Sequence, residues 1–195
     1  MDYFKNEIVP EDGAALLRVL KQSDFEELKK IAYEEGMWAY NPMSVHDDAS
    51  LQRWMDKAFA DYKAKTRIPF VIIDKATGRT AGCTSYMNIA FEDARLEIGS
   101  TWLGKDFRSS GLNKHCKFLL VSYAIEKMGI IRVEFKTDVL NLRSRRALGK
   151  IGAFEEGILR SHMAMHDGRR RDTIYFSILS NEWEFVKQNH FRELL

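Results

Sequence analysis

The sequence predicts an α+β (mixed α/β) fold, in which helices cover both faces of a mixed β-sheet. Strand-like and helix-like segments alternate along the chain, as such a fold requires. One strand–helix–strand unit, residues 94–138, demands a parallel strand pair joined by a right-handed crossover. Short turns containing Gly78 and Gly168 join other strands into antiparallel hairpins. Because the 195 residues include no linker-like stretch, we expect one domain spanning residues 1–195.

In the first half of the chain, apolar spacing predicts two helices and four strands. Ser23 and Glu26 have the spacing of a capping box, which would begin the first helix and let it end near Gly36. Leu51 and Trp54 begin an apolar stripe on the second helix. The expected strands are 15–20, 70–74, 80–89 and 94–103, and the second helix is 48–64.

The second half of the chain predicts three strands, a long helix, a short helix and an aromatic tail helix. The short helix ends before Gly152, a residue suited to the left-handed position that follows many helices. The tail helix carries Trp183, Phe185 and Val186, which could pack within one chain or across a homodimer. The expected strands are 131–138, 156–163 and 172–178, and the expected helices are 113–128 and 144–151.

Composition argues against several function classes. A formal net charge of +2 is too small to indicate a nucleic-acid-binding protein. Cys83 and Cys116 are too few for a disulfide framework, so we expect core thiols in a reducing compartment. The N-terminus lacks an apolar signal region and no apolar run reaches about 18 residues, which predicts a cytoplasmic protein without a membrane segment. The scattered histidines have no metal-ligand spacing, so we expect no metal.

The stretch FRSSGLN, residues 107–113, joins a predicted strand to a predicted helix. A helix N-terminus presents unpaired amide donors and partial positive charge, which together bind anions. Gly111 would let a phosphate approach the backbone, Arg108 would add a charged fork, and Ser109 and Ser110 would add hydroxyl donors. The stretch therefore suggests a pyrophosphate site, although a plain turn and helix cap would leave the same pattern. P-loop and dinucleotide motifs are absent.

Further motifs accompany this loop in order, namely LEIGSTWL (96–103), RVEFKTDVLNLRSRRALGKIGAFEEG (132–157) and GRRRDTIYFSILSNEW (168–183). With these motifs the chain resembles the GCN5-related N-acetyltransferase (GNAT) superfamily, in its RimJ/RimL-like ribosomal-protein N-acetyltransferase group. The resemblance covers nearly the whole chain. It implies a GNAT fold with a central, mostly antiparallel twisted sheet, one splayed parallel strand pair and helices on both faces.

The resemblance also implies that acetyl-CoA is the cosubstrate and that it binds where the parallel strands separate. The family's coenzyme A loop reads Arg or Gln, two residues, Gly, one residue, then Gly or Ala, and Asn113 departs from that pattern. Asn141 and Ser144 correspond to the family's N-x-x-S element, in which the Asn binds pantetheine and the Ser hydroxyl lies near the sulfur. The residues implied in coenzyme binding are Thr101, Trp102, Leu103, Arg108, Ser109, Ser110, Gly111, Leu112, Asn113, Asn141 and Ser144.

Direct transfer of an acetyl group from acetyl-CoA to a primary amine requires a base for the ammonium proton and stabilisation of the leaving thiolate. Glu97 is the candidate base, acting through water, and Ser144 is the candidate acid. Glu97 could instead pair with an arginine or face solvent, and Ser144 could serve only as a helix cap. Such a ternary-complex mechanism would need no acyl-enzyme, so neither cysteine would act as a nucleophile.

The acceptor could be a protein N-terminal α-amine or a small-molecule amine. Trp38 and Tyr40, in the loop GMWAYNPMS, and the strand residue His162 are candidate substrate-binding residues. The loop could equally pack onto the core, and His162 could be ordinary surface. An acidic pocket would favour a cationic small amine, whereas an open groove would favour a peptide. The alternative function on the same fold is a catalytically silent protein that senses acyl-CoA, or one that binds RNA or the ribosome through basic runs 143–146 and 169–171.

Overall fold

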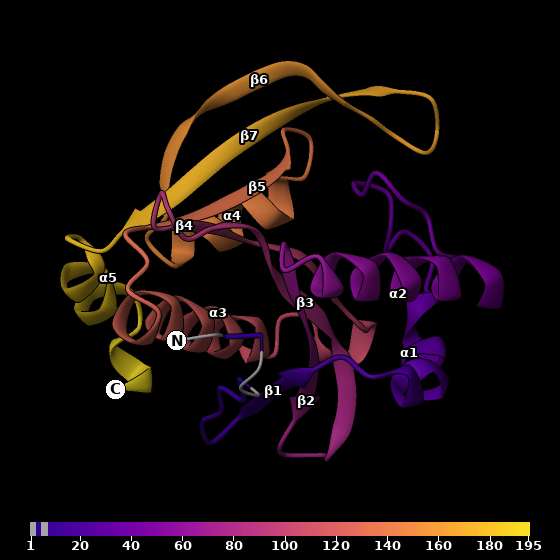
Figure 1. Cartoon of the computed structure of the whole chain (residues 1–195), viewed down its shortest axis with the longest axis horizontal. Helices are drawn as coiled ribbons and strands as arrows, with labels where there is room; N and C mark the ends of the chain where they lie inside the picture. Colours follow the sequence, from indigo (N-terminus) through magenta and orange to yellow (C-terminus); the bar gives the residue numbers. More distant parts are fainter. Residues whose placement is uncertain (1–2, 5–7) are drawn as a thin grey trace.

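The computed structural model describes residues 3–4 and 8–195, and these residues form one seven-stranded sheet (Figure 1). The strand order is β1-β2-β3-β4-β5-β7-β6. Every neighbouring pair is antiparallel except β4 and β5, which are parallel. The expected fold class is therefore confirmed. The strands are β1 (Ala15–Val19), β2 (Arg67–Asp74), β3 (Arg79–Ala90), β4 (Arg95–Leu103), β5 (Arg132–Asp138), β6 (Phe154–Ala164) and β7 (Arg170–Leu179).

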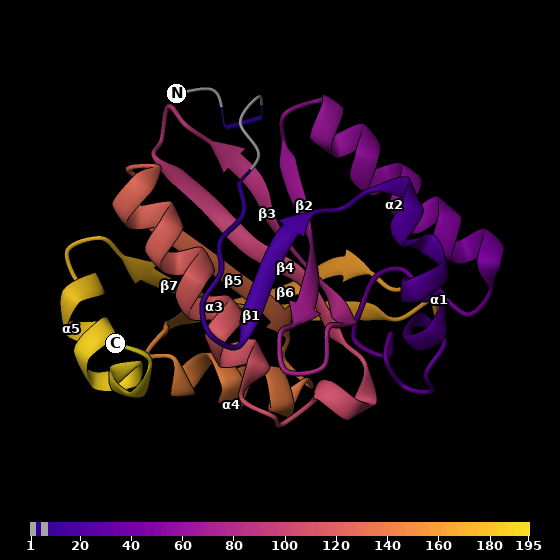
Figure 2. The ribbon, with the colours of Figure 1, turned by 90° about the horizontal axis from the view of Figure 1, so that it is seen from below.

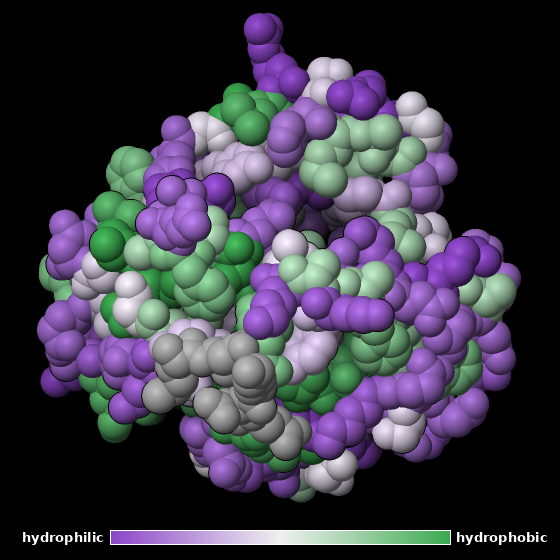
Figure 3. Space-filling model, viewed as in Figure 1, coloured by the Kyte–Doolittle hydropathy of each residue, from purple (hydrophilic) through white to green (hydrophobic). Residues whose placement is uncertain are grey.

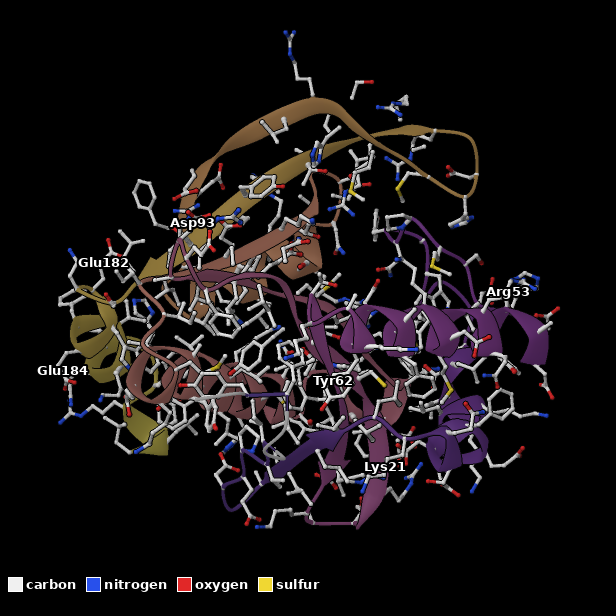
Figure 4. All side chains as sticks on the ribbon, in the orientation of Figure 1. Lys21, Arg53, Tyr62, Asp93, Glu182 and Glu184 are labelled. Carbon is white, nitrogen blue, oxygen red and sulfur yellow. The ribbon has the colours of Figure 1, made fainter. Side chains whose placement is uncertain are left out.

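Helices cover both faces of the β1–β3 half of the sheet. Along β2, Ile68, Phe70 and Ile72 pack into the cluster that contains α3, whereas Val71 packs into the cluster that contains α1 and α2. This alternation follows from the two-residue period of a strand that is buried on both faces. Figures 1 and 2 show α3 and α2 on opposite sides of these strands, and Figure 4 shows side chains filling the space between the layers. The helices are α1 (Phe25–Ala32), α2 (Asp48–Lys63), α3 (Leu112–Ser122), α4 (Leu142–Lys150) and α5 (Trp183–His190).

The predicted capping box at Ser23 and Glu26 is wrong. The Asp24 carboxylate instead accepts a hydrogen bond from the Lys21 amide at 2.8 Å and pairs with Arg18 at 2.6 Å. A buried carboxylate held by an arginine is a stronger acceptor than a serine hydroxyl, so Asp24 caps a 3₁₀ turn, Gln22–Asp24, that precedes α1. Helix α1 then ends at Ala32, before the expected Gly36, and α2 is capped by Asp47, which accepts from the Ser50 amide at 2.7 Å.

The parallel strands β4 and β5 separate after a short pairing. Residues Arg95–Glu97 pair with residues Arg132–Glu134, and no pairing follows Glu97. The register between β3 and β4 also shifts in this region, and Ser100 adopts a left-handed φ of 49°. The part of β4 from residue 98 to 103 therefore presents one edge of its backbone to the space between the two strands.

Candidate active site

A cavity of about 780 Å³ lies where β4 and β5 separate. Figure 3 shows a recess in the surface below the β6–β7 hairpin. The N-termini of α3 and α4 contribute Gly111, Asn113, Asn141 and Ser144 to the lining, and this part is called here the coenzyme end. A loop and two strands contribute Met37, Tyr40, Asn41, Lys136 and Arg171, and this part is called here the acceptor end. Residues 98–103 of β4 also line the cavity.

The start of α3 has the features of an anion site. Gly111 has a φ of 91°, and a Cβ at this position would meet no atom within 4 Å. Because a helix of this length presents free amides at its first turn, an anion could approach the backbone here. The Ser110 hydroxyl does not line the cavity, since it donates to the Phe107 carbonyl and accepts from the amide of buried Leu112. Ser109 does line it.

Arg108 lines the cavity but is already bound. Its guanidinium pairs with Glu34 at 3.1 Å and donates to the Leu103 carbonyl at 2.9 Å. The Glu34 carboxylate also accepts from the Lys105 amide. In this structure Arg108 therefore fastens the loop before α3 to the end of β4 rather than presenting a free charged fork.

Two buried polar atoms in the cavity wall have no hydrogen-bond partner among the described residues, the donor Trp102 Nε1 and the acceptor Asn113 Oδ1. Leaving such groups unpaired costs free energy, so unpaired buried groups commonly mark a ligand or water position. Because neither atom is accessible to solvent, a ligand in the cavity would reach them only if the side chains moved. The cations of the lining and the open start of α3 suit the phosphate groups of coenzyme A, so the residues present fit that group.

Asn141 and Ser144 lie together at the start of α4. The Asn141 side chain accepts a hydrogen bond from the Ser144 amide at 3.0 Å and so caps the helix. The alternative in which Ser144 is the cap is therefore wrong. The Ser144 side chain lines the cavity, and its hydroxyl bonds to no described residue.

Glu97 is buried and held by two partners. Its carboxylate pairs with Lys136 at 2.9 Å and accepts from the Asn88 amide group at 2.7 Å. The Glu97 side chain does not line the cavity, whereas Lys136 does. The sequence left two structural alternatives for Glu97, exposure to solvent and pairing with an arginine. Glu97 is not exposed, and it forms an ion pair with a lysine in place of the expected arginine. The catalytic role of Glu97 stays a prediction.

Lys117 is a residue of the site that sequence reasoning missed. It is only 6% exposed, lines the cavity and donates to the Thr101 hydroxyl at 2.9 Å. Burial lowers the pKa of Lys117 to about 8, and the nearby Glu97 charge acts in the opposite direction. The sequence could have predicted that Lys117 belongs to the site, because Lys117 follows the candidate Asn113 by four positions and so lies on the same face of α3.

Of the candidate acceptor residues, only Tyr40 lines the cavity. Trp38 is buried, donates from Nε1 to the Ala32 carbonyl and packs against Trp54 and Trp102. His162 is exposed on β6, where its ring lies 6.0 Å from that of Tyr175. The structure therefore brings Tyr40 to the cavity and leaves Trp38 and His162 outside it.

The cysteines are free, buried and outside the cavity lining. Burial raises the pKa of both thiols, which keeps them protonated and poorly nucleophilic. The described residues contain no group of three or more metal-ligating side chains. Among residues 3–4 and 8–195, no helix is both long and apolar enough to span a membrane.

The cavity wall is strongly cationic. Among the described residues, its lining contains eight lysines and arginines and neither aspartate nor glutamate. A wall of this kind attracts anionic ligands and repels polycations. The cations are Arg108, Lys114, Lys117, Lys136, Arg143, Arg146, Lys150 and Arg171.

Comparisons with known proteins agree with this geometry. The family profile described as "Acetyltransferase (GNAT) domain" matches residues 15–153. A GCN5-related N-acetyltransferase from Brucella melitensis superposes with a TM-score of 0.89 at 30% identity, over 97% of this chain and 86% of that one. A Bacillus subtilis protein named "Putative ribosomal N-acetyltransferase YdaF" is 28% identical over 180 residues, which are 88% of this chain and 94% of that protein.

A Mycobacterium smegmatis RimJ in complex with CoA-disulfide shares the fold, with a TM-score of 0.76 at 22% identity over 90% of this chain and 86% of that one. The profile match covers most of the chain, and it includes the splayed strands, the start of α3 and α4. The chain therefore belongs to the GNAT acetyltransferase family and is an acyltransferase.

Proposed function

We propose that this acetyltransferase transfers the acetyl group of acetyl-CoA directly to the α-amine of a protein N-terminus. The observation that carries the proposal is the cavity between the splayed strands, with its cationic lining beside the open N-terminus of α3. The names of the Bacillus relative and of the RimJ neighbour favour a protein acceptor and a coenzyme A ligand. A wall without carboxylates argues against cationic small amines.

The coenzyme would lie along residues 98–103 of β4. The amides at the start of α3 would bind its pyrophosphate, with Gly111 leaving room for close approach. The exposed cations Arg143, Arg146 and Lys150 on α4 would add charge at the phosphate groups.

When bound, acetyl-CoA supplies the thioester that acylates the amine. Glu97, through water, would accept the proton that the ammonium must lose before the nitrogen can attack. The Ser144 hydroxyl would stabilise or protonate the thiolate that leaves when the C–S bond breaks. Lys136, which is paired with Glu97 at 2.9 Å and lines the cavity, would link the carboxylate to the cavity.

The test combines turnover with coenzyme binding. We expect the protein to release coenzyme A thiol from acetyl-CoA in the presence of N-terminal peptides. Glu97→Gln should lower kcat about a hundredfold while the Kd for acetyl-CoA, measured by calorimetry, changes less than about twofold. Glu134→Gln is the matched control, because Glu134 is the parallel partner of Glu97 on β5 and does not line the cavity.

Other outcomes would point to the alternative functions. Binding of acetyl-CoA without turnover on any amine would favour an acyl-CoA sensor. Binding of RNA that weakens steeply with salt would favour a ribosome- or RNA-binding protein. The single-domain organisation over residues 1–195, the cytoplasmic location and the choice between monomer and homodimer stay predictions, and light scattering would decide the last.

A further inference from the structure

The eight cations of the cavity wall differ in burial, since three are exposed, two are buried and three are half-buried. Arg143, Arg146 and Lys150 are exposed on α4, at the coenzyme end, where a phosphate-bearing ligand accounts for them. Lys117 and Arg171 are instead buried, at 6% and 5% exposure, and neither forms an ion pair within the described part of the chain. A buried charge without a counter-charge is expensive, so each requires an explanation.

Arg171 has the more telling position. It lies on β7 at the acceptor end, where its Nη1 donates to the Tyr40 carbonyl at 3.2 Å and its Nε donates to the Thr173 hydroxyl at 3.1 Å. Its Nη2 bonds to no other described residue. The guanidinium lines the cavity beside Met37 and Asn41, so it can reach a ligand there.

A purely structural role does not account for this residue. Holding the Tyr40 loop against β7 needs only a neutral donor, and both acceptors that Arg171 uses are neutral oxygens. The nearby carboxylates already have partners, because Asp138 pairs with Arg169 at 2.7 Å and Glu97 pairs with Lys136. Arg171 therefore has a free donor and no described carboxylate within ion-pair distance, although Asp138 and Glu97 act on its charge from further away.

We propose that Arg171 binds a carboxylate of the acceptor molecule, close to the amine that receives the acetyl group. This inference rests on the proposed function and narrows its substrate class. The acceptor is a protein N-terminus that carries a carboxylate near the reacting amine, and a free amino acid is the other source of such a carboxylate, which the experiment separates. Arginine suits this task because its planar fork offers two parallel hydrogen bonds to a carboxylate. Polyamines and other polycations are excluded by the same charge.

The experiment compares carboxylate with amide at one position. The matched acceptors are two C-terminally amidated tetrapeptides, Ser-Asp-Ala-Gly and Ser-Asn-Ala-Gly, which differ in charge and hardly in shape. The second pair, serine and serinamide, tests the free amino acid as the source of the carboxylate. We expect the wild type to prefer the acidic member of one pair by about tenfold in kcat/KM, the size of one charged hydrogen bond.

Variants then assign that preference to Arg171. In Arg171→Gln the acid-to-amide ratio of kcat/KM should fall to about one, and glutamine, whose Nε2 lies where the arginine Nε does, can still donate to the Thr173 hydroxyl. Arg171→Lys keeps the charge and should retain part of the preference. Arg170→Gln is the control, because Arg170 is exposed, bonds to Ser161 and does not line the cavity. A merely structural residue would lower activity on both peptides equally and leave their ratio unchanged.

Two results would overturn the inference. The first is that wild-type kcat/KM is the same for the acidic and the amide acceptor in both pairs. The second is that a folded Arg171→Gln variant keeps the wild-type preference for the acidic acceptor. Failure of the proposed function is a separate result, with acetyl-CoA bound and no acceptor consumed. In that case the N-acetylated forms of both peptides are titrated against protein saturated with coenzyme A. About tenfold tighter binding of the acidic form, lost in Arg171→Gln, would still support carboxylate recognition, and equal binding would refute it.

Discussion

The two ends of the cavity carry positive charge in different ways. At the coenzyme end three charges, on Arg143, Arg146 and Lys150, are exposed, while Arg108 is half-buried and paired with Glu34. At the acceptor end Arg171 is buried and hydrogen-bonded to Tyr40, and the half-buried Lys136 is paired with Glu97. Exposed charges attract a ligand over a distance and adapt to its shape, whereas buried ones discriminate between ligands.

This difference suggests that the two parts of the cavity have different functions, one in affinity and the other in selectivity. The coenzyme is the same in every turnover, so its end needs affinity from many weak contacts. The enzyme must distinguish its acceptor from other amines, so the acceptor end uses a few buried contacts, and the loss of any one of them lowers affinity strongly. Substitutions at the coenzyme end should therefore change the acetyl-CoA Kd, and substitutions at the acceptor end should change the relative use of acceptors.

The largest expected effect is at Gly111. Gly111→Asp places a carboxylate where the pyrophosphate would lie, and the open space around its Cβ position means that little else must move. Repulsion at close range should weaken acetyl-CoA binding by about a hundredfold or more in calorimetry. Aspartate tolerates a left-handed φ better than most residues do.

The matched control is Gly78→Asp, in the turn between β2 and β3. Gly78 has a left-handed φ of 69° and equally open surroundings, but it is not part of the cavity. It should cost similar backbone strain and leave acetyl-CoA affinity unchanged. Equal acetyl-CoA affinity in Gly111→Asp and Gly78→Asp would mean that the start of α3 does not bind the coenzyme.

The next effect concerns Lys117, which lies between the two ends. Its pKa in the folded protein is about 8, below the usual value of 10.5, so the unfolded state holds its proton more tightly. Lys117 therefore penalises folding at pH 7.5, and the penalty is relieved as the pH rises from about 8 to 10.5. Lys117→Met should be more stable than the wild type near neutral pH, and that advantage should shrink by about 3 kcal/mol by pH 10.5.

Urea unfolding at several pH values measures this difference. Lys57→Met, on the exposed surface of α2, is the control, and its difference from wild type should stay nearly constant over the same range. A constant difference for Lys117→Met would mean that the buried ammonium is stabilised by a partner as well as it is in water.

The smallest expected effect is at Arg146. Because this side chain is exposed, Arg146→Gln should raise the Kd for acetyl-CoA only about threefold at low salt. The difference should vanish at about 0.5 M salt, where screening is strong. Arg160→Gln, an exposed change on β6 outside the cavity, should have no effect. An effect of Arg146→Gln that persists at high salt would show that the coenzyme end also contains a fixed contact.

The fold was largely predictable from the sequence because its strongest signals are local. Alternation in β1–β4, the glycines of the two hairpin turns and the 94–138 crossover together determine a mixed sheet, and the family resemblance supplied the splayed pair. The capping-box prediction was wrong because Asp24, next to Ser23, provides the capping side chain instead. Arg18 on β1 holds the Asp24 carboxylate in place through an ion pair. The spacing of residues within one segment cannot predict an ion pair with a residue of another helix or strand.

The site was predictable at the coenzyme end and much less so at the acceptor end. Gly111, Asn113, Asn141 and Ser144 stand in short motifs, and all four line the cavity. Arg171 lay in a basic run that resembled solvated surface, yet alternation along β7 buries Arg171 and exposes its neighbour Arg170. Trp38 was misplaced because its packing against Trp54 and Trp102 depends on three separate elements.

That tryptophan cluster has an optical consequence. Trp38, Trp54 and Trp102 have ring centroids within 6.3 Å of one another, and the fourth tryptophan of the chain, Trp183, begins α5 and packs against Phe118 and Phe191. Excitation is therefore shared among three indoles, and one of them belongs to Trp102, a residue that lines the cavity. The emission of the unlabelled protein should change when a ligand fills the cavity, so the chain carries its own fluorescent probe of cavity occupancy.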